Sequence, residues 1–490
     1  MSETVRDSNI NHDPAIDTDI GEETLYTKSS GNERSIYDFR EFGNDAYKVP
    51  EGLGRDIVEQ ISKEKNDPDW MRDFRLRCLD IYNNTAIPAW GPPIEGLDMN
   101  NIITYIRPNT DMKKSWEEVP SDIKTAFEKL GIPDAEKKYL AGVGAQYDSE
   151  LVYHNLQSEV AEMGVVYSDL ESAMKSEFAD MIREYFMSLV PPTDHKFAAL
   201  HGAVWSGGSF VYVPKGVKVE IPLQSYFRLN AKGAGQFEHT LIIVDEGADL
   251  HFIEGCSAPK WNVANLHAGC VELFVKKNAR LRYSTIENWS KNMYNLNTKR
   301  AIVDEGARME WVSGSFGSHV SYLYPTTILK GDGSDCEYTS ITFSGKGQNL
   351  DTGCRMVHLG RNTSSIVTSK SLSKDGGIGT FRSAIEVRPA AHGSRSSVDC
   401  STLMLDDISR SDTIPTIDVR TDDCDIGHEA RIGSISEEAV FYLMSRGISE
   451  EEARVMIVSG FANPVSKELP LEYAAEMNNL IKLEMEGSMS

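Results

Sequence analysis

Three residues with metal-binding side chains lie within six positions near the end of the chain. Cys424, His428 and Glu429 occur in the stretch "CDIGHEARIGS". Thiolate, imidazole and carboxylate are groups that hold zinc and iron in proteins. On a loop these side chains could reach one ion, whereas in a strand His428 and Glu429 would point to opposite faces. The stretch alone is compatible with a metal site or with a polar approach to a C-terminal helix.

Two further cysteines stand in surroundings that favour reactivity. Cys256 lies in "EGCSAP", between a glycine and a proline, where we expect an accessible bend. Cys400 lies in "SSVDCSTLML", after the basic stretch "HGSRSS", and nearby positive charge would stabilise its thiolate. An inert strand thiol is the alternative for both. Apolar surroundings instead predict buried structural thiols at Cys78, Cys270 and Cys336.

Several common site motifs are absent from the sequence. It contains no C-x-x-C pair, which argues against a zinc ribbon or a ferredoxin-type cluster site. It has no G-x-x-x-x-G-K-[ST] motif for ATP hydrolysis and no G-x-S-x-G nucleophile elbow. The ligands of any metal must therefore converge from distant positions or from a second chain.

The composition is that of a soluble globular protein. The 490 residues are 40% hydrophobic and 25% charged, enough for two or three domains. A formal net charge of −24 disfavours nucleic acid and anionic membranes as partners. The odd count of seven cysteines argues against a disulfide framework. Without a long apolar run or a secretory signal at the start, we expect a cytoplasmic protein.

An internal repeat organises the middle of the chain. "IVDEGADLHF" begins at Ile243 and "IVDEGARMEW" at Ile302, and the related "FVKKNARLRY" and "LKGDGSDCEY" begin at Phe274 and Leu329. The turn positions fall 27 to 31 residues apart, at Gly247, Asn278, Gly306, Gly333, Asn362 and Gly393. Short strands with a period near 30 residues predict a β-solenoid, in which stacked coils bury a continuous core. A β-sandwich with chance similarity is the alternative.

The repeats and their flanks predict four regions. We expect a flexible arm over residues 1–35, a mainly helical domain over 36–199, the β-helix core over 200–430 and a C-terminal helical domain over 431–490. Helical spacing or capping residues mark "GLGRDIVEQISKEK", "PDWMRDFRLRCLDIY", "PSDIKTAFEKLGIP" and "MKSEFADMIREYFMSLV". Ser436 and Ser449 are expected to cap C-terminal helices.

Long motifs in the chain resemble the SufB/SufD family of the SUF iron–sulfur assembly machinery, on its SufB side. They are "DPDWMRDFRLRCLDIYNN", "FEHTLIIVDEGADLHFIEGCSAP", "ENWSKNMYNLNTKRA" and "HEARIGSISEEAVFYLMSRGISEEEARVMIVSGF". The resemblance implies a right-handed parallel β-helix between helical domains. It also implies a non-enzymatic scaffold that accepts persulfide sulfur and iron, builds a transient [4Fe-4S] or [2Fe-2S] cluster and passes it to apo-proteins.

The same resemblance implies partners. They are a SufC-like ABC ATPase docked at the C-terminal helices, a SufD-like paralogue or a second copy of this chain, and a cysteine desulfurase or sulfur-transfer protein. Reduced flavin is a further cofactor to consider in the complex.

It also implies site residues. Cys256 matches the sulfur-accepting cysteine, and the family's hydrophilic path maps onto Arg228, Asn230, Glu287, Trp289 and Lys299. The cluster-building cysteine maps onto Cys400, with Glu429 and His428 as further ligands. Cys424 becomes a bystander. Because Cys400 precedes Glu429 by 29 residues, about one coil, we expect the two on neighbouring strands.

Two other interpretations remain open on the sequence. The chain could be a SufD-like structural subunit without its own cluster, against which Cys256, Cys400 and "HEA" argue. It could also be a β-solenoid enzyme such as a polysaccharide lyase or an acyltransferase. That class needs a carboxylate cluster or a catalytic histidine along one groove, and no acidic stack follows the repeat.

Overall fold

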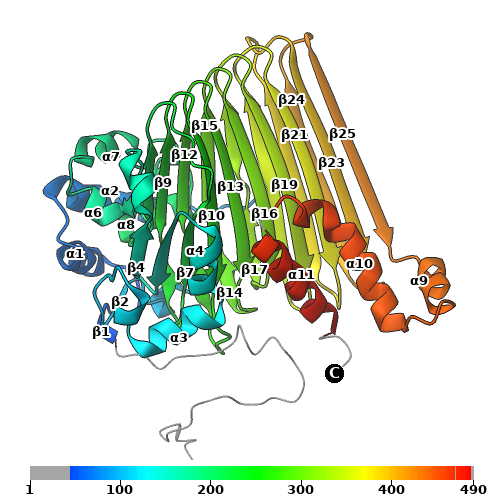
Figure 1. Cartoon of the computed structure of the whole chain (residues 1–490), viewed down its shortest axis with the longest axis horizontal. Coiled ribbons are helices and arrows are strands. Elements are labelled where there is room, and N and C mark those ends of the chain that lie inside the picture. The colour runs from blue at the N-terminus through cyan, green and yellow to red at the C-terminus, as the bar shows by residue number, and fades with distance from the viewer. Residues whose placement is uncertain (1–44, 470, 487–490) are drawn as a thin grey trace, which may run out of the picture.

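The computed structural model describes residues 45–469 and 471–486, so the arm expected over residues 1–35 lies outside the described part. A parallel β-solenoid forms the centre of the molecule, which confirms the predicted fold class (Figure 1). Its coils run from the β6 region to β25, with helices at the N-terminal end and further helices beside the last coils.

Two sheets form the walls of the solenoid. The ten-stranded sheet contains β3 (Gly142–Tyr147), β4 (Glu150–Leu156), β7 (Leu223–Arg228), β10 (Asp249–Ser257), β13 (Arg280–Asn288), β16 (Arg308–Phe316), β19 (Asp335–Ser344), β21 (Ser364–Ser373), β23 (Ser394–Met404) and β25 (Cys424–Ser434). All its neighbouring strands are parallel except β3 and β4.

The second wall consists of shorter strands at the start of the solenoid and longer ones toward its end. It contains β5 (Val166–Asp169), β6 (Ser209–Val213), β8 (Gly235–Gln236), β9 (His239–Val244), β11 (Asn265–His267), β12 (Cys270–Val275), β14 (Met293–Asn295), β15 (Thr298–Val303), β17 (Val320–Leu323), β18 (Thr326–Leu329), β20 (Asn349–His358), β22 (Ile378–Val387) and β24 (Arg410–Val419). A separate pair joins β1 (Asp45–Lys48) to β2 (Ile106–Pro108).

The predicted turn positions explain how each coil closes. All six residues adopt a left-handed backbone, with φ from 53° at Asn362 to 71° at Gly393. They are Gly247, Asn278, Gly306, Gly333, Asn362 and Gly393. Glycine enters this region without a Cβ clash, and asparagine tolerates it better than most residues. The repeat therefore places the residues able to make the turn at the same point of each coil.

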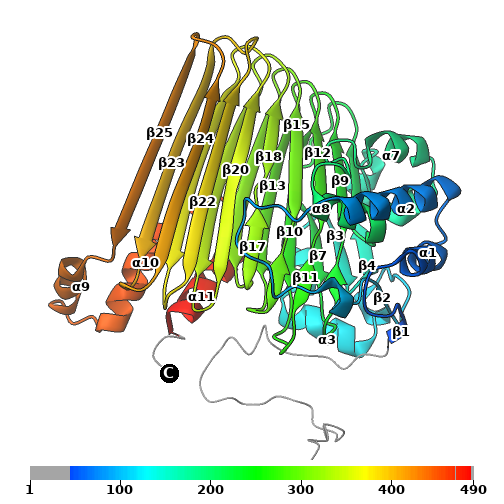
Figure 2. The ribbon, with the colours of Figure 1, turned by 180° about the vertical axis from the view of Figure 1, so that it is seen from behind.

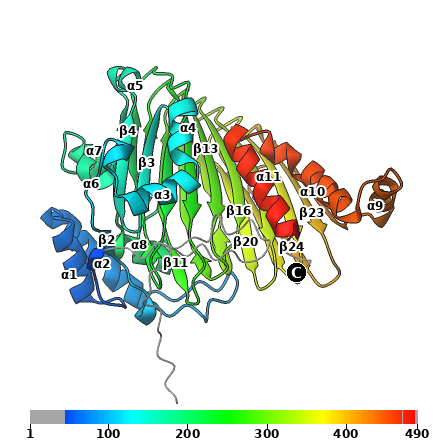
Figure 3. The ribbon, with the colours of Figure 1, turned by 60° about the horizontal axis from the view of Figure 1, so that its bottom comes forward.

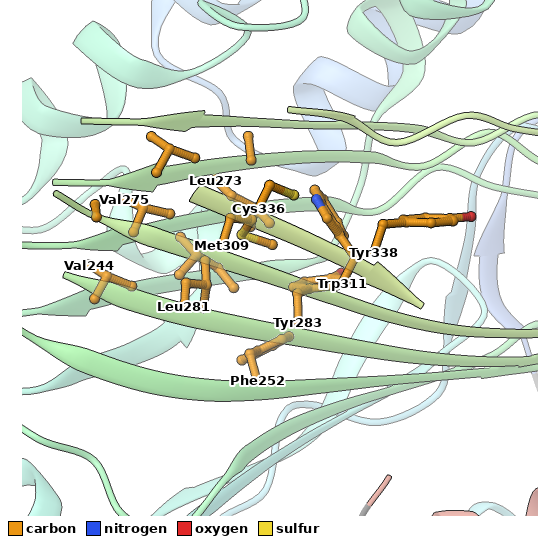
Figure 4. Packing of buried hydrophobic residues seen from close by; sticks show 14 of the residues in the cluster. Val244, Phe252, Leu273, Val275, Leu281, Tyr283, Met309, Trp311, Cys336 and Tyr338 are labelled. Atoms are coloured by element: carbon orange, nitrogen blue, oxygen red, sulfur yellow. The ribbon is translucent and has the colours of Figure 1, made fainter. Parts of the chain in front are cut away.

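The repeat also aligns the core. Leu250, Leu281, Met309 and Cys336 pair in register on four successive strands. Two residues further along, so do Phe252, Tyr283, Trp311 and Tyr338, and both ladders point into the buried interior (Figure 4). Cys336 is 2% exposed and fills an apolar position, as its place in the repeat predicted.

The N-terminal helices cover the start of the solenoid. They are α1 (Arg55–Glu64), α2 (Asp69–Asn84), α3 (Ser121–Lys129), α4 (Ile132–Tyr139), α5 (Ser158–Glu162), α6 (Leu170–Ala173), α7 (Ala179–Tyr185) and α8 (Lys196–Val204), with short 3-10 turns at Met99–Asn101 and Trp116–Glu118. Figure 2 shows α2 and α8 beside β9 and β12. Apolar side chains of α2, α6 and α7 pack there on Phe210, Leu241 and Phe274.

One expectation about this region was wrong in detail. The helix predicted over "MKSEFADMIREYFMSLV" is interrupted, and only α7 forms as a longer helical piece. Met187 takes a left-handed backbone with φ 50° and ends the helical run before Pro191. Strands β3, β4 and β5 also lie inside the region expected to be mainly helical, where they extend both walls of the solenoid.

Three helices follow the last strand. They are α9 (Glu437–Met444), α10 (Glu450–Ser466) and α11 (Leu471–Glu486), and Figure 3 shows α10 and α11 across the outer face of the ten-stranded sheet. Val458, Ala462 and Met477 pack there against strand residues such as Ile286 and Ile341. Ser436 caps α9 and Ser449 forms the predicted capping box with Glu452. No helix of the described residues is long and apolar enough to cross a membrane.

Candidate functional site

Cys256 lies at the end of β10 and faces the solenoid interior. Its side chain is 1% exposed, so the accessible bend expected at "EGCSAP" was wrong. The strand runs through the glycine and stops only after Ser257, because β10 remains paired with both β7 and β13. Burial and the nearby Glu254 carboxylate raise the pKa of Cys256 well above its ordinary value, so the resting group is a thiol.

A buried ion network surrounds this thiol. Lys299, on the opposite wall, places its Nζ 3.0 Å from Glu254 Oε1 and 3.4 Å from Glu287 Oε1. Tyr283 donates its hydroxyl to Glu254 Oε2 at 2.5 Å. Burial opposes the charge of Lys299, but the two carboxylates outweigh it and raise its pKa, so the ammonium persists. Glu287 pairs in register with Cys256, which puts both side chains on one face of adjacent strands.

The network continues toward the second wall. Asn295 donates to Glu287 Oε2 at 2.6 Å, and its amide oxygen lies 2.8 Å from His267 Nδ1. His267 Nε2 is 2.5 Å from Glu238 Oε1. Burial lowers the pKa of His267, but the Glu238 carboxylate raises it further, with a net upward shift. Buried polar side chains thus form a continuous chain from Tyr283 to Glu238, in which the Asn295 amide joins Glu287 to His267.

The other residues matched to the hydrophilic path lie at the edges of this network. Trp289 is buried, with its ring centroid 4.6 Å from that of His267. Arg228 pairs with Ser257, one residue beyond Cys256, and Arg228 Nη1 donates to Ser257 Oγ at 3.2 Å. Strand alternation places Arg228 and Cys256 on opposite faces of the sheet.

Asn230 follows the end of β7 and is held through its backbone. Its backbone N–H donates to Asp148 Oδ1 at 2.7 Å, and its carbonyl accepts from Trp261 Nε1 at 2.9 Å. Burial raises the pKa of Asp148 to about 7. Asn230 therefore helps to fix the chain where it leaves the strand that neighbours Cys256.

Two rows of polar residues run inside the solenoid from this network to Cys400. Register pairing joins one row as Glu254, Thr285, Ser313, Ser340, Ser369 and Cys400. It joins the other as Cys256, Glu287, Ser315, Thr342, Ser371 and Thr402. We call the serines and threonines between the two ends the hydroxyl rows. Five strand spacings separate the ends, roughly 24 Å for parallel strands.

Cys400 sits on β23 with its side chain in the interior and is 4% exposed. Its thiol donates to the Glu429 carbonyl oxygen with an Sγ–O distance of 3.4 Å. Burial raises the pKa of Cys400. The thiolate stabilisation expected from "HGSRSS" was wrong, because Arg395 is exposed and alternation places it on the other face of β23.

The stretch "GHEA", which contains His428 and Glu429, forms part of β25 rather than a loop. The predicted one-coil relationship is confirmed, since β25 pairs with β23 and sets Glu429 beside Asp399 and Ala430 beside Cys400. His428 turns inward, and its Nε2 lies 3.1 Å from Ser383 Oγ. Glu429 turns outward and forms a 2.8 Å ion pair with Arg431. Cys400 and His428 thus share the interior face, while the Glu429 carboxylate lies on the outer face.

Sequence reasoning missed several residues of the buried network, namely Glu238, Glu254, His267, Tyr283 and Asn295. One signal was available, because Glu254 stands two residues before Cys256 and must share its face in any strand. The others come from different coils and meet only through the closure of the solenoid. Cys424 is partly buried and packs at the edge of the apolar core.

A separate metal-capable group lies outside this interior. Among the described residues, His201, His239 and Cys270 place one potential ligand atom each within 4.8 Å of the others. All three side chains are buried between α8, which contains His201, and the outer side of the second wall, where His239 and Cys270 lie.

Comparisons with known proteins agree with this arrangement. Residues 227–461 match the family model described as "SUF system FeS cluster assembly, SufBD core domain". Residues 58–225 match the model "SufBD protein N-terminal region". Together the two matches cover most of the described chain.

Curated relatives align over nearly their whole length. The iron–sulfur cluster assembly protein SufB of Bacillus subtilis is 52% identical over 453 residues, which cover 92% of this chain and 97% of the relative. An iron–sulfur cluster assembly SufBD family protein of Staphylococcus epidermidis is 51% identical over the same shares. One of Staphylococcus aureus is 50% identical. With both family models matched and these identities sustained end to end, the chain belongs to the SufBD family of the SUF iron–sulfur cluster assembly system.

Proposed function

We propose that the chain is the scaffold on which an iron–sulfur cluster is built, with sulfur entry at Cys256 and assembly at Cys400. The cluster is a product that the chain releases to apo-proteins, and its type is [4Fe-4S] or [2Fe-2S]. The observation that carries the proposal is the pair of polar rows linking the two cysteines through the interior.

Sulfur entry is a thiol exchange. The Cys256 thiolate attacks the outer sulfur of a donor persulfide, the donor's S–S bond breaks, and the donor leaves as a thiolate while Cys256 gains the persulfide. Because the resting thiol is protonated, a base must accept its proton. Glu287, register-paired with Cys256 on the same face, is our candidate for that base. Lys299 offsets the negative charge that forms.

The donor must reach a buried atom. Residues 258–264 follow β10 and come to the surface at Lys260 and Asn262. We propose that this loop opens toward a cysteine desulfurase or a sulfur-transfer protein. Arg228, Asn230 and Trp289 border the same end of the interior and position it for entry.

We propose that sulfide takes the outer sulfur from the Cys256 persulfide: the S–S bond to Cys256 breaks, Cys256 leaves as a thiolate, and a hydrodisulfide ion forms and moves along the hydroxyl rows. The Cys400 thiolate then attacks one sulfur of this ion and releases the other as sulfide, so that Cys400 gains the persulfide. Conversion of one persulfide sulfur to sulfide consumes two electrons, for which we propose reduced flavin as the donor. The rows offer hydroxyl hydrogen bonds and no thiol between their ends, so they conduct without trapping.

The cluster end holds an incomplete ligand set. Cys400 supplies a soft thiolate for iron, and His428 shares its face. Glu429 can join only if β25 twists or a second chain rearranges this edge, because its carboxylate points outward. A weak and exchangeable carboxylate ligand fits a scaffold that must release its product.

Partners are proposed from the surfaces near this end. Both β24 and β25 end the pairing order of their walls among the described residues, and Ile417 and Ile432 are half exposed there. A SufD-like paralogue or a second copy of this chain would cover such an edge. Helix α9 exposes Phe441, Tyr442 and Met444, where we place a SufC-like ABC ATPase. ATP hydrolysis belongs to that partner, since this chain has no P-loop motif.

The test follows sulfur between the two cysteines. The chain is incubated anaerobically with a cysteine desulfurase and cysteine. Persulfides are trapped by alkylation, and the masses of the peptides are measured by mass spectrometry. We expect one added sulfur on Cys256 in wild type and in Cys400→Ser. In Cys256→Ser, sulfur at Cys400 should vanish as well. Undiminished labelling of Cys400 in Cys256→Ser would overturn the proposed route.

A further inference from the structure

The buried group of His201, His239 and Cys270 joins the N-terminal helices to the solenoid. His201 lies on α8, and His239 and Cys270 are register-paired first residues of β9 and β12. Alternation turns both strand residues to the outer face, away from the interior that contains Cys256 and Cys400. His201 Nε2 lies 2.9 Å from His239 Nδ1.

The neighbours of each ring fix where its proton sits. His201 Nδ1 is 2.9 Å from the Ala268 carbonyl oxygen, which can only accept, so this nitrogen carries the hydrogen. His239 Nε2 is 3.1 Å from Glu272 Oε2 and therefore also carries the hydrogen. In neutral rings, the two nitrogens that face each other, His201 Nε2 and His239 Nδ1, then both lack a hydrogen and present lone pairs.

Glu272 acts as an acceptor on every side. Its Oε1 accepts from the backbone N–H groups of Leu189 and Val190 at 2.7 and 2.9 Å. Its Oε2 accepts from the Met187 N–H at 2.5 Å. Both carboxylate oxygens of Glu272 thus accept backbone hydrogen bonds, and Oε2 also faces His239 Nε2 as an acceptor.

Two bare nitrogens at hydrogen-bond distance need a cation between or beside them. We infer that His201, His239 and Cys270 bind a divalent transition-metal ion of the zinc or ferrous class, with Glu272 as the carboxylate that orients His239. This site is separate from the proposed assembly site, and the inference does not rest on the proposed function.

The donor set fits that class of ion. Two imidazole nitrogens and a thiolate suit zinc and ferrous iron, and hard cations such as magnesium prefer oxygen. Zinc–nitrogen bonds of about 2.0–2.1 Å in a tetrahedral site require the two nitrogens to separate by only a few tenths of an ångström. A carboxylate hydrogen-bonded to the far nitrogen of a ligating histidine is a recurring companion of such sites.

The position suggests what the ion does. It would clamp α8 onto β9 and β12, and through Glu272 it would also hold the segment from Met187 to Val190. That segment includes the left-handed backbone of Met187, a conformation that needs support from its surroundings. The bound ion would thus have a structural role, joining the N-terminal helices to the solenoid.

The test uses the full chain carrying Cys256→Ala and Cys400→Ala, so that metal at the assembly site does not contribute. Because the group is buried, metal is supplied during expression, in zinc- or cobalt-supplemented medium, and the purified protein is dialysed against a chelator. We expect about one ion per chain by elemental analysis. The cobalt form should show a thiolate-to-cobalt charge-transfer band.

Matched substitutions locate the ion. Adding His239→Gln or Cys270→Ser should remove the metal and the band, and should lower the melting temperature of the metal-grown protein. Cys336→Ser, which changes an equally buried solenoid thiol outside the group, should retain both. The cobalt spectrum needs no change at the site, so it decides the matter even if a variant fails to fold. Absence of metal and band in the parent chain, or their persistence in Cys270→Ser, would overturn the inference and leave a shared proton between the rings.

Discussion

Cys256 and Cys400 point into the same solenoid interior from strands five spacings apart, offset by two residues in register. Cys256 aligns with Thr402 and Cys400 with Glu254, so each cysteine begins or ends one of two adjacent rows. Parallel in-register stacking keeps side chains of successive coils on one line. The fold thereby converts a sequence separation of 144 residues into a straight interior path.

Lys299 is expected to hold the buried network together. Lys299→Met would leave Glu254 and Glu287 without their buried counter-charge, and loss of one partner of such a pair costs about 3–5 kcal/mol. Denaturant unfolding of the variant measures this loss. Adding Glu254→Gln to Lys299→Met should recover part of it, and additive effects of the two changes would contradict the coupling.

Interior hydroxyls are expected to conduct sulfur. Ser369→Leu places a branched apolar side chain in the row that ends at Cys400. The variant should still form persulfide at Cys256 and still build a cluster from free sulfide, yet fail to build one from desulfurase-derived sulfur. Thr368→Val, on the outer face of the same strand, is the control. Equal desulfurase-driven assembly in both variants would exclude passage along this row.

Glu310 should make the free energy of unfolding depend on pH in the acidic range. Burial alone would raise the pKa of Glu310, but hydrogen bonds from Arg280 and Arg308 lower it to about 2 from an ordinary 4.5. Its stabilisation is therefore complete above the unfolded value and is lost as the pH falls from 4.5 toward 2. The difference between 4.5 and about 2 corresponds to ~3 kcal/mol, and because Arg280 and Arg308 are nearly half exposed, solvent screening reduces the expected cost of Glu310→Gln to ~2 kcal/mol at neutral pH. The cost should be small near the low end of that window. Unfolding at several pH values checks this, and a pH-independent cost would contradict it.

The exposed face of α9 should bind the ATPase. Phe441 is 71% exposed, so Phe441→Ser should leave the melting temperature unchanged and weaken binding of a SufC-like ATPase at least tenfold, the loss expected for an interface anchor. Titration calorimetry measures the affinity. Met112→Ser, at 41% exposure on the N-terminal side, serves as the control. Unchanged affinity in Phe441→Ser would move the docking surface elsewhere.

Local rules predicted much of the fold. The Gly or Asn at each turn determines where a coil closes. After the first four turns a small, a charged, an apolar, a polar and an aromatic residue follow in this order, as in "ADLHF" after Gly247, and this alternation predicted the ladder from Leu250 to Cys336. The helix caps at Ser436 and Ser449 were also predictable, because a cap depends on residues within one turn of the helix start. The interruption near Met187 was not, because Glu272, 85 residues away, accepts its N–H and favours the left-handed turn.

The site was less accessible from sequence. The partners of Lys299, Glu254 and Glu287, come from strands on the opposite wall, so no local sequence pattern predicts these ion pairs. The burial of Cys256 depends on strand pairing continuing past a glycine. Which of His428 and Glu429 faces Cys400 depends on whether the segment is a loop or a strand, and strand pairing with β23 decides it for His428.

The most direct test of the scaffold is anaerobic reconstitution of the purified chain with iron and sulfide, read by visible absorption, with the SufC-like and SufD-like partners added if the chain alone gives no band. Wild type and Cys256→Ala should develop the broad charge-transfer band of an iron–sulfur cluster, since free sulfide bypasses sulfur entry. Cys400→Ala should lose it, Glu429→Ala should weaken it, and Cys336→Ala should keep it. A full band in Cys400→Ala, or no band in wild type even with partners, would contradict the account.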